Sequence, residues 1–381
     1  MDFAWTDEQA HLRETILKFA KGKLNEGYAE REKRGEFNRD GWMECAGIGL
    51  HGLPVPEEYG GMGLDALTTM GVLERLGYGC KDNGLVFSIN AHMWTLEIPL
   101  LNFGTDEQRK RYLPKLCSGE LVGANAMSEP GSGSDAYSIS TTAEKRGGRY
   151  VLNGSKVFVT NGPIADIVIV YATVDRSKGP NGVTAFLVEK GMDGFSAGAH
   201  TEKMGLRTSP MSELYFDDCA VPEENRLGRE GAGKNLFTDS MTWERSCILA
   251  SAVGTMDRIL ETCIDYANER QQFGEPIGKF QLIASKIVDM KMRLETSRAL
   301  LYRAGWLRSK GKNIFLEAAM AKLQISESLV QTALDAVQIH GGYGYMAEYE
   351  MERELRDAVS SRLYSGTSEI QRLIIASLLG V

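Results

Sequence analysis

A loop rich in glycine and serine is the first part of the sequence whose residue types could do chemistry. Residues 127–135 read Met-Ser-Glu-Pro-Gly-Ser-Gly-Ser-Asp. Glycines let backbone N–H groups approach an anionic group closely, and the hydroxyls of Ser128 and Ser134 add hydrogen-bond donors. A Gly/Ser-rich segment is also typical of a flexible linker. By its composition alone, this segment therefore indicates either an anion-binding loop or a linker.

Two further segments contain groups that could act on a substrate. Residues 364–367 read Tyr-Ser-Gly-Thr, and residues 240–246 contain the neighbouring pair Glu244 and Arg245. The hydroxyl of Ser365 cannot act as a general base unaided, because its conjugate base is scarcely populated near neutral pH. A glutamate can, but acidic residues are also favoured in a first helical turn by the helix dipole. From the residues alone, we expect Glu244 and Arg245 to form a solvent-exposed pair on the surface.

The composition bounds the possible functions. The chain has 381 residues, of which 43% are hydrophobic and 25% charged, enough for two or three domains with a buried core. Its formal charge of −8 argues against nucleic acid as a partner, because phosphate binding usually leaves a basic footprint. The five histidines lack the spacing of metal ligands, so we predict no metal site.

Cysteine usage and the absence of export signals predict a cytoplasmic protein. The six cysteines are widely spaced and include no Cys-x-x-Cys pair, as expected for reduced thiols. Residues 1–8 contain neither a basic segment nor an apolar run of the signal-peptide type. No stretch of 18 apolar residues could span a bilayer, so we predict no membrane association.

Hydrophobic periodicity divides the chain into three predicted domains. Residues 1–120 read as helices broken by loops, and Thr6 can cap the first of them. Residues 121–228 read as short strands of a small sandwich or barrel, with an Asn-Gly turn at 153–154 between two β-prone runs. Residues 229–381 read as helices again, and four helices joined by short loops predict a bundle.

Within the last region the apolar pattern predicts individual helices. Apolar residues between 248 and 267 trace one helical face. Further helical runs are predicted near residues 281–309 and 313–340, and a last one follows Gly366. We expect the first helix of the bundle to begin with residues 240–246.

Five segments together resemble motifs of the acyl-CoA dehydrogenase family. They are residues 127–135, 158–162 (Phe-Val-Thr-Asn-Gly), 270–274 (Arg-Gln-Gln-Phe-Gly) with Gln281, 338–344 (Gln-Ile-His-Gly-Gly-Tyr-Gly) and 364–372. The segments follow the family's order and cover nearly the full length, so isolated structural turns do not account for them. The resemblance implies an α+β fold with a helical N-terminal domain, a central β-barrel or sandwich and a C-terminal four-helix bundle.

The resemblance also implies one FAD per subunit. The family's cofactor positions fall on Met127, Ser128, Gly133, Ser134, Phe158, Val159, Thr160, Arg270, Phe273, Gln281, Gln338, Gly341, Gly342, Thr367 and Glu369. The segment with Arg270 and Phe273 is similar to the part that reaches the FAD of a neighbouring subunit, which implies a homotetramer. Arginine suits a pyrophosphate because its fork can bind two oxygens at once. This chain departs from the family at Phe158, where tryptophan is common, and at Glu369, where glutamine is common.

The same resemblance identifies a catalytic base. Many members carry a glutamate where this chain has Ser365, but the isovaleryl-CoA and long-chain branches place it at the position of Glu244. This implies that Glu244 takes the α-proton of a thioester while a hydride leaves the β-carbon for flavin N5. Trp243 and the apolar run after it would desolvate Glu244 and raise its pKa. The loop of Ser365 and Gly366, with Arg245, would complete the site, and the backbone N–H of residue 365 would polarise the thioester carbonyl.

Four segments resemble a narrower group, the prolyl-carrier-protein dehydrogenases of natural-product and toxin pathways. They read Met-Thr-Trp-Glu-Arg at 241–245, Tyr-Ser-Gly-Thr at 364–367, Asn-Gly-Pro-Ile-Ala-Asp-Ile at 161–167 and Gly-Leu-Val-Phe at 84–87. Members of that group oxidise an L-prolyl thioester on an acyl or peptidyl carrier protein to a dehydroprolyl, pyrroline or pyrrole thioester. The implied partners are this carrier protein and an electron acceptor, either an electron-transfer flavoprotein or oxygen.

Two other functions stay open at this point. One is an ordinary dehydrogenase of short or branched acyl-CoAs with a relocated base, and the other is a catalytically silent flavin-binding scaffold. Protein that is yellow and bleaches anaerobically with an acyl thioester would exclude the scaffold. Bleaching by prolyl-carrier protein but not by acyl-CoAs would favour the prolyl dehydrogenase.

Overall fold

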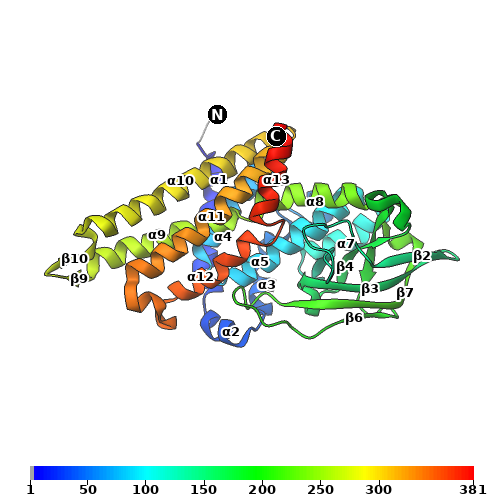
Figure 1. Ribbon diagram of the computed structural model, residues 1–381, viewed down its shortest axis with the longest axis horizontal. Coiled ribbons are helices and arrows are strands. Elements are labelled where there is room, and N and C mark those ends of the chain that lie inside the picture. The colour runs from blue at the N-terminus through cyan, green and yellow to red at the C-terminus, as the bar shows by residue number, and fades with distance from the viewer. Residues whose placement is uncertain (1–3) are drawn as a thin grey trace.

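The molecule is elongated, with long helices at one end and a β-sheet at the other (Figure 1). The computed structural model describes residues 4–381. Residues 1–3, which begin the first predicted domain and the segment expected to lack a signal peptide, lie outside the described residues. Within the described part, no helix has both the length and the apolar character needed to cross a membrane.

The first region is helical, as predicted. Its helices are α1 (Asp7–Phe19), α2 (Tyr28–Arg34), α3 (Arg39–Gly47), α4 (Ala66–Gly79), α5 (Asn83–His92), α6 (Ile98–Phe103) and α7 (Asp106–Cys117). A π-helix, Met93–Glu97, joins α5 to α6. The cap predicted at Thr6 is confirmed: its hydroxyl accepts a hydrogen bond from the Gln9 N–H, and the Gln9 side chain accepts one from the Thr6 N–H. This reciprocal pair satisfies two backbone donors at the start of α1.

The second region forms a mixed sheet. Its strands are β1 (Gly123–Ala126), β2 (Thr142–Arg146), β3 (Arg149–Thr160), β4 (Ile167–Thr173), β5 (Val183–Glu189), β6 (Phe195–Ala197), β7 (Met211–Pro222) and β8 (Arg226–Leu227). Their order is β6-β7-β3-β2-β4-β5-β8, and β1 pairs in parallel with β4. Every residue of β4 is buried, which explains why this strand is apolar nearly throughout rather than alternating.

The hairpin turn predicted at Asn153 and Gly154 is wrong. β3 runs through both residues, Asn153 pairs with Thr142 of β2, and the register against β7 shifts at this point. The turn between β2 and β3 lies instead at Gly147 and Gly148, whose φ angles are 49° and 75°. A type I′ hairpin turn needs positive φ at both central positions, which two glycines supply without strain. The Asn-Gly pair is left to form a bulge.

The last region returns to helices, as predicted. Its elements are α8 (Gly233–Cys247), α9 (Ala250–Glu269), β9 (Gln271–Gln272), β10 (Glu275–Pro276), α10 (Gln281–Ser309), α11 (Phe315–His340), α12 (Met351–Val359) and α13 (Ser368–Leu379). The expectation that a helix begins with residues 240–246 is wrong. The chain turns at Gly231, where φ is 77°, and α8 begins directly afterwards, so Glu244 lies in its last turn.

The N-terminal and C-terminal helices approach each other very closely. A Cβ added at Gly77 of α4 would lie 2.0 Å from the Ser251 carbonyl oxygen, and one added at Gly254 of α9 would lie 1.9 Å from the Glu74 carbonyl oxygen. Only glycine permits backbones to approach this far. The helices of both regions therefore share one hydrophobic core, to which α10 and α11 also contribute.

Helix α8 connects the sheet to this shared core. Near its start, Leu236 packs with Leu100 of α6 and Ile169 of β4. At its end, Cys247 belongs to the core that the two helical regions share. Because its two ends are anchored in different cores, α8 fixes Glu244 relative to the sheet and the bundle at once.

Candidate active site

Glu244 has a buried carboxylate whose two oxygens differ in their hydrogen-bond partners. The residue is 6% exposed, and its Oε1 accepts a hydrogen bond from the Ser365 hydroxyl at 2.5 Å. Its Oε2 is buried and has no hydrogen-bond partner among residues 4–381. The interpretation of Glu244 as part of a solvent-exposed pair is therefore wrong. The structure brings Glu244 together with Ser365, which follows it by 121 residues in the chain.

Burial raises the pKa of Glu244 above the ordinary glutamate value, because the charged carboxylate loses its solvation. Three groups act in the opposite direction. They are the hydrogen bond from Ser365 and the positive charges of Arg245 and Lys322. Burial outweighs them, and the result is a carboxylate suited to accept a proton nearer neutral pH.

Trp243, which was expected to desolvate Glu244, lies between two other groups. Its ring stacks on Trp94 of the π-helix, with ring centroids 5.9 Å apart and planes inclined by 5°. The Arg308 guanidinium carbon lies 3.3 Å from the centroid of the same ring. The Ser240 hydroxyl also donates to the Trp94 carbonyl oxygen at 3.0 Å. The π-helix thus braces the last turns of α8, in keeping with the frequent occurrence of π-helical turns at functional sites.

The loop at residues 364–367 holds Ser365 in an unusual backbone conformation. Its φ is 58°, in the left-handed region that residues other than glycine seldom adopt. The Ser365 carbonyl oxygen accepts hydrogen bonds from Arg245 Nε at 3.0 Å and from Gln371 Nε2 at 3.1 Å. Gln371 Nε2 also donates to the Gly366 carbonyl oxygen at 2.9 Å. The Ser365 backbone N–H finds no protein acceptor in the described part of the chain.

Lys322 is a charged group near this loop that sequence reasoning missed. It is fully buried on α11, and its Nζ has no hydrogen-bond partner among the described residues. The Nζ lies 5.9 Å from the ring centroid of Tyr364. Burial, helped by the charge of Arg245, lowers the pKa of Lys322 to about 8, while the charge of Glu244 opposes this shift. A lysine one turn before Ile325, on the buried face of a helix, was the signal that could have found it.

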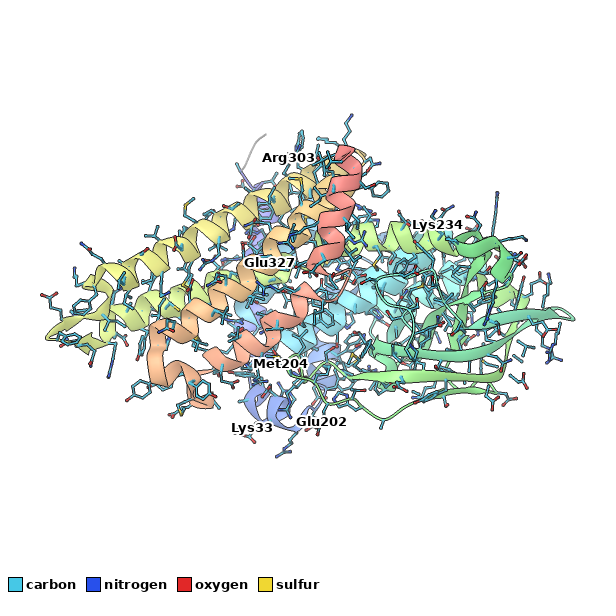
Figure 2. All side chains as sticks on the ribbon, viewed as in Figure 1. Lys33, Glu202, Met204, Lys234, Arg303 and Glu327 are labelled. Atoms are coloured by element: carbon cyan, nitrogen blue, oxygen red, sulfur yellow. The ribbon has the colours of Figure 1, made fainter. Side chains whose placement is uncertain are left out.

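A second set of contacts holds the loop against α11. Glu327, which Figure 2 places on α11 close to the start of α13, accepts from the Ser368 hydroxyl at 2.6 Å and from Arg362 Nη2 at 2.5 Å. The Thr367 hydroxyl accepts from the Ile370 N–H at 3.3 Å and so caps α13. These contacts explain how a strained residue 365 keeps one conformation.

Two of the predicted cofactor segments lie side by side at the sheet. The Val157 N–H donates to the Ser128 carbonyl oxygen at 2.9 Å. The buried ammonium of Lys156 donates to the Met127 carbonyl oxygen at 3.0 Å and to Glu129 Oε1 at 2.8 Å. The segment at 127–135 is therefore joined to the part of β3 directly before residues 158–160 by main-chain and buried ionic contacts, as an ordered binding loop requires and a flexible linker does not.

The geometry around Phe158 fits a flat ligand. Its φ is 57° and its side chain is 71% exposed, next to a register shift between β3 and β7. A Cβ added at Gly133 would meet nothing within 4 Å, so the loop has open space on that side. Val159 is buried in the sheet core, which leaves only its backbone to face a ligand. Thr160 ends β3 and is half-buried.

Six of the other predicted cofactor residues lie at the opposite end of the molecule. Arg270 and Phe273 belong to the β9–β10 hairpin, which Figure 1 shows at the tip farthest from the sheet, and Phe273 is 95% exposed. The Arg270 guanidinium carbon lies 5.5 Å from the ring centroid of Tyr343. The same end of the molecule contains Gln281, Gln338, Gly341 and Gly342. A single chain does not bring these residues to Phe158.

A second buried carboxylate, Glu97, lies outside this site. Burial raises its pKa, and its Oε2 has no partner among the described residues. Its Oε1 lies 3.1 Å from His92 Nε2, and the Gly123 N–H donates to His92 Nδ1 at 2.9 Å. Since Nδ1 accepts, Nε2 carries the ring proton and donates it to Glu97. These bonds tie the π-helix to β1 and include no predicted site residue, so the contacts explain Glu97 structurally.

Comparison with known proteins establishes the family. Residues 6–120 match the N-terminal domain of acyl-CoA dehydrogenases, residues 124–219 match the middle domain and residues 231–380 match the C-terminal domain. The chain belongs to the acyl-CoA dehydrogenase family.

The similar relatives include prolyl-carrier-protein enzymes as well as acyl-CoA dehydrogenases. The chain is 43% identical to an L-prolyl-(peptidyl-carrier protein) dehydrogenase of Serratia sp. (strain ATCC 39006), covering 100% of this chain and 99% of the relative. It is 51% identical to the crystal structure of the prolyl acyl carrier protein oxidase AnaB, with a TM-score of 0.98 over 99% of this chain and 100% of that one. A structure of PigA with FAD and proline is 43% identical, with a TM-score of 0.98 over 100% and 99% of the two chains.

Proposed function

We propose that this protein is a FAD-dependent dehydrogenase that oxidises an L-prolyl thioester on an acyl or peptidyl carrier protein. One observation carries the proposal: the buried carboxylate of Glu244, with one oxygen unpartnered, is hydrogen-bonded to Ser365, whose backbone N–H also lacks an acceptor among the described residues. A base and a carbonyl-polarising donor side by side are what proton removal next to a thioester requires. The substrate class comes from the relatives named for prolyl-carrier proteins.

Each active-site residue of this chain has a separate role in the proposed reaction. Glu244 takes the α-proton, and its raised pKa matches that task. The Ser365 N–H donates to the thioester carbonyl oxygen and stabilises the charge that develops there. Arg245 holds this donor in place through its hydrogen bond to the Ser365 carbonyl oxygen. When bound, FAD supplies the acceptor for the hydride that leaves the β-carbon.

The FAD-binding residues that we propose within one subunit lie along the sheet and at the start of α13. They are Met127, Ser128, Gly133, Ser134, Phe158, Val159, Thr160, Thr367 and Glu369. The exposed ring of Phe158 suits one face of a flat ring system, and the open space at Gly133 suits a group that approaches the backbone. The residues present therefore fit the cofactor.

A small cavity beside the loop supports a short, cyclic acyl group. It measures about 50 Å³. Its lining includes the side chains of Phe87, Ile248, Ala252 and Tyr364 and the polar Asn83, Glu354 and Asp357, but neither Glu244 nor Ser365. Tyr364 directly precedes the loop serine, and Ile248 follows the proposed base by one helical turn. This volume takes roughly three to five water molecules. A five-membered ring matches this space better than a long acyl chain does.

We propose that a neighbouring subunit completes the cofactor site in a homotetramer, through Arg270, Phe273, Gln281, Gln338, Gly341 and Gly342. The position of the β9–β10 hairpin at the tip of the subunit supports this proposal. Exposed apolar side chains, which mark association surfaces, follow α10 and α13. They include Leu282, Val288, Met292, Leu373 and Leu379.

We further propose domain boundaries at 1–120, 121–228 and 229–381 and a cytoplasmic location. The location rests on the cysteines, all six of which are buried free thiols, as is typical of a reducing compartment. The proposed electron acceptor is an electron-transfer flavoprotein or oxygen.

Anaerobic reduction of the bound flavin tests the proposed activity. Purified FAD-loaded protein is mixed with carrier protein bearing an L-prolyl thioester, and bleaching of the flavin absorbance is followed. Mass spectrometry of the carrier then reads the loss of two or four hydrogens. Bleaching by isovaleryl-CoA or butyryl-CoA instead would assign an acyl-CoA dehydrogenase, and yellow protein that no acyl thioester bleaches would assign a silent scaffold.

FAD retention tests the proposed contribution of the neighbouring subunit. Arg270→Ala removes a charge-assisted phosphate contact of about 1.5–3 kcal/mol, so we expect FAD to be lost on gel filtration at concentrations where the wild type retains it. A stable monomer with full FAD would contradict this arrangement.

A further inference from the structure

Ser365 has a backbone conformation that a glycine would adopt with less strain. Its φ of 58° lies in the left-handed region, and hydrogen bonds from Arg245 and Gln371 to its carbonyl oxygen maintain that conformation. The backbone N–H assigned to the substrate carbonyl would be the same with glycine at this position. The backbone therefore gives no reason for a side chain here.

The Ser365 side chain makes one contact that glycine could not make. Its hydroxyl donates to Glu244 Oε1 at 2.5 Å, at the short end of the range for a hydrogen bond from a hydroxyl to a charged acceptor. The carboxylate is thereby made asymmetric, because Oε1 is occupied while Oε2 is buried without a partner in the part of the chain described. A carboxylate held at one oxygen has a fixed plane, and its second oxygen keeps a fixed direction.

We propose that Ser365 is a positioning residue that holds Glu244 through Oε1 and leaves Oε2 as the oxygen that accepts the substrate proton. This inference rests on the proposed function and deepens it, because it assigns separate tasks to the two oxygens of the base. The loop then acts twice: its N–H polarises the carbonyl group, and its hydroxyl orients the base.

The surrounding charges show what the hydroxyl adds. The ionisable groups near Glu244 are Arg245 on the same helix, Lys322 on α11, Tyr364 on the loop and Tyr171 on β4. Arg245 and Lys322 favour the charged carboxylate from a distance, but neither donates a hydrogen bond to it. Ser365 is therefore the group in direct contact, and a hydroxyl that donates to a carboxylate also lowers its pKa.

Two variants remove the hydroxyl in different ways. Ser365→Ala keeps a side chain at positive φ, whereas Ser365→Gly also removes the backbone strain and guards against a folding defect. The matched control is Ser360→Ala, which removes a hydroxyl of the same segment that donates to the Asp357 carbonyl oxygen. All proteins are studied with FAD bound.

The first readout needs no substrate. Infrared difference spectra follow the protonated carboxyl band of Glu244 against pH, and Glu244→Gln identifies the band. A hydrogen bond to a charged group contributes about 1.5–3 kcal/mol. We therefore expect the midpoint to rise by about one to two pH units in both Ser365 variants and to stay at the wild-type value in Ser360→Ala.

The second readout is the rate of anaerobic flavin reduction by prolyl-carrier protein. We expect both Ser365 variants to react about 10- to 100-fold more slowly, with part of the loss recovered at higher pH. An unchanged infrared midpoint in Ser365→Gly overturns the proposal, whatever the rate. If wild-type protein is not reduced by prolyl-carrier protein, the proposed function fails, while the infrared titration still decides the role of Ser365.

Discussion

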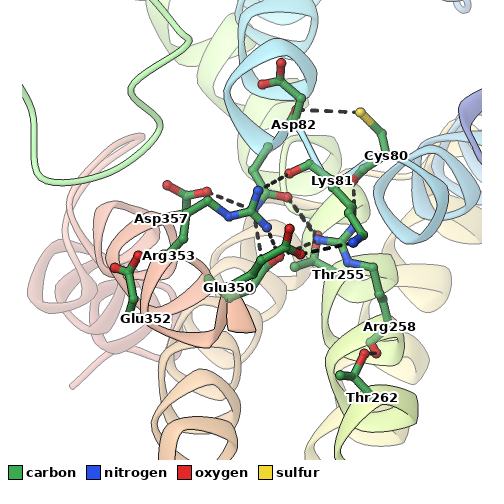
Figure 3. A network of polar contacts seen from close by, with 12 residues as sticks. Cys80, Lys81, Asp82, Thr255, Arg258, Thr262, Glu350, Glu352, Arg353 and Asp357 are labelled. Carbon is green, nitrogen blue, oxygen red and sulfur yellow. Dashed lines mark hydrogen bonds and ion pairs between the residues drawn. The ribbon is translucent and has the colours of Figure 1, made fainter. Parts of the chain in front are cut away.

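Two buried glutamates in this protein have opposite surroundings. Glu354 on α12 accepts hydrogen bonds from Arg258 at 3.0 Å and from Arg353 at 2.6 Å, two residues of the polar network in Figure 3. Its second oxygen accepts from Asn83 at 3.0 Å. Glu244 accepts one hydrogen bond, from a neutral hydroxyl, and its second oxygen accepts none in the part of the chain that the structure describes.

The opposite surroundings give opposite pKa shifts. Burial by itself raises the pKa of both carboxyl groups, because each loses its solvation. For Glu354 the charges of Arg258 and Arg353, together with hydrogen bonds from Asn83 and Arg258, outweigh burial and lower the pKa, whereas for Glu244 burial prevails. Glu354 is thus a permanently charged group that joins helices, while Glu244 can change its charge. Pairing with cations, rather than burial, separates Glu354 from Glu244.

Asp357 shows that a raised pKa is not sufficient to identify a base. Burial raises its pKa to about 6. However, its oxygens accept hydrogen bonds from the Leu206 N–H at 2.6 Å and from Asn83 Nδ2 at 2.9 Å. Both oxygens are occupied by groups that join α12 to other elements. The free oxygen of Glu244, together with its place beside the loop, is what distinguishes the proposed base.

Glu244→Gln removes the reactive carboxylate of this comparison, and we expect it to have the largest effect of all the variants. Glutamine keeps the size of the side chain but cannot accept a proton, so flavin reduction by prolyl-carrier protein should fall by at least about 10²–10⁴-fold. Stopped-flow bleaching measures the rate, and the absorbance spectrum of bound FAD is the control for folding. Reduction at a near wild-type rate would show that another group is the base.

Glu354→Gln removes the structural carboxylate of this comparison. It leaves Arg258 and Arg353 buried without their carboxylate, so we expect the unfolding free energy to fall by about 3–5 kcal/mol. Thermal denaturation followed by circular dichroism measures the loss. Glu144→Gln, which removes an exposed pair with Arg146, should leave the melting temperature close to the wild-type value, because solvent screens exposed ion pairs. Equal melting temperatures for the two variants would contradict the assigned role of Glu354.

Lys322→Met tests a buried charge that has no paired carboxylate. The folded-state pKa of about 8 lies below the ordinary value of 10.5, so the native state binds fewer protons than the unfolded state between these values. Wild-type stability should therefore rise with pH across this window. Methionine should stabilise the protein by up to about 3 kcal/mol below pH 8, and the gain should disappear near pH 10.5.

Urea denaturation at several pH values measures the effect of Lys322→Met. The control is Lys286→Met, which removes a lysine that contacts Asp335 at 3.2 Å and should destabilise the protein instead. Loss of the Lys322 charge should also raise the midpoint of the Glu244 titration, since this charge favours the ionised carboxylate. A destabilised Lys322→Met protein at pH 7 would contradict the unpaired state of the ammonium.

Arg258→Lys should have the smallest effect. The guanidinium donates to the Gly77 and Cys80 carbonyl oxygens as well as to Glu354. Lysine keeps the charge but loses the fork, so we expect a loss of about 1–2 kcal/mol in stability with no change in the pH dependence of flavin reduction. A loss as large as that of Glu354→Gln would show that hydrogen-bond geometry, rather than charge, dominates this network.

Local patterns in the sequence predicted most of the fold. The cap at Thr6 and the run at 281–309 follow from residues that are close in sequence, and the structure has both. The hairpin prediction failed because two dipeptides, Asn-Gly and Gly-Gly, each satisfy the local rule for a turn. Only the pairing of the strands decides between them, and that pairing is set by contacts far along the chain.

The candidate site was less predictable, for a related reason. On the residues alone, Glu244 and Arg245 indicated an exposed pair, and only the family resemblance pointed to a base. Neither Lys322 nor the hydroxyl of Ser365 was assigned a role, because their importance depends on what faces them across the bundle. The FAD contacts and the domain boundaries stay predictions.

The separation of 121 residues from Glu244 to Ser365 also sets an order of events during translation. A ribosome adds about 5–20 residues per second, so the serine is made roughly 6–24 seconds after the glutamate. During that interval the nascent chain already contains the whole sheet and α8, but the carboxylate has no hydroxyl to orient it. The sheet can therefore be formed well before the active site, which is completed only when the loop between α12 and α13 docks.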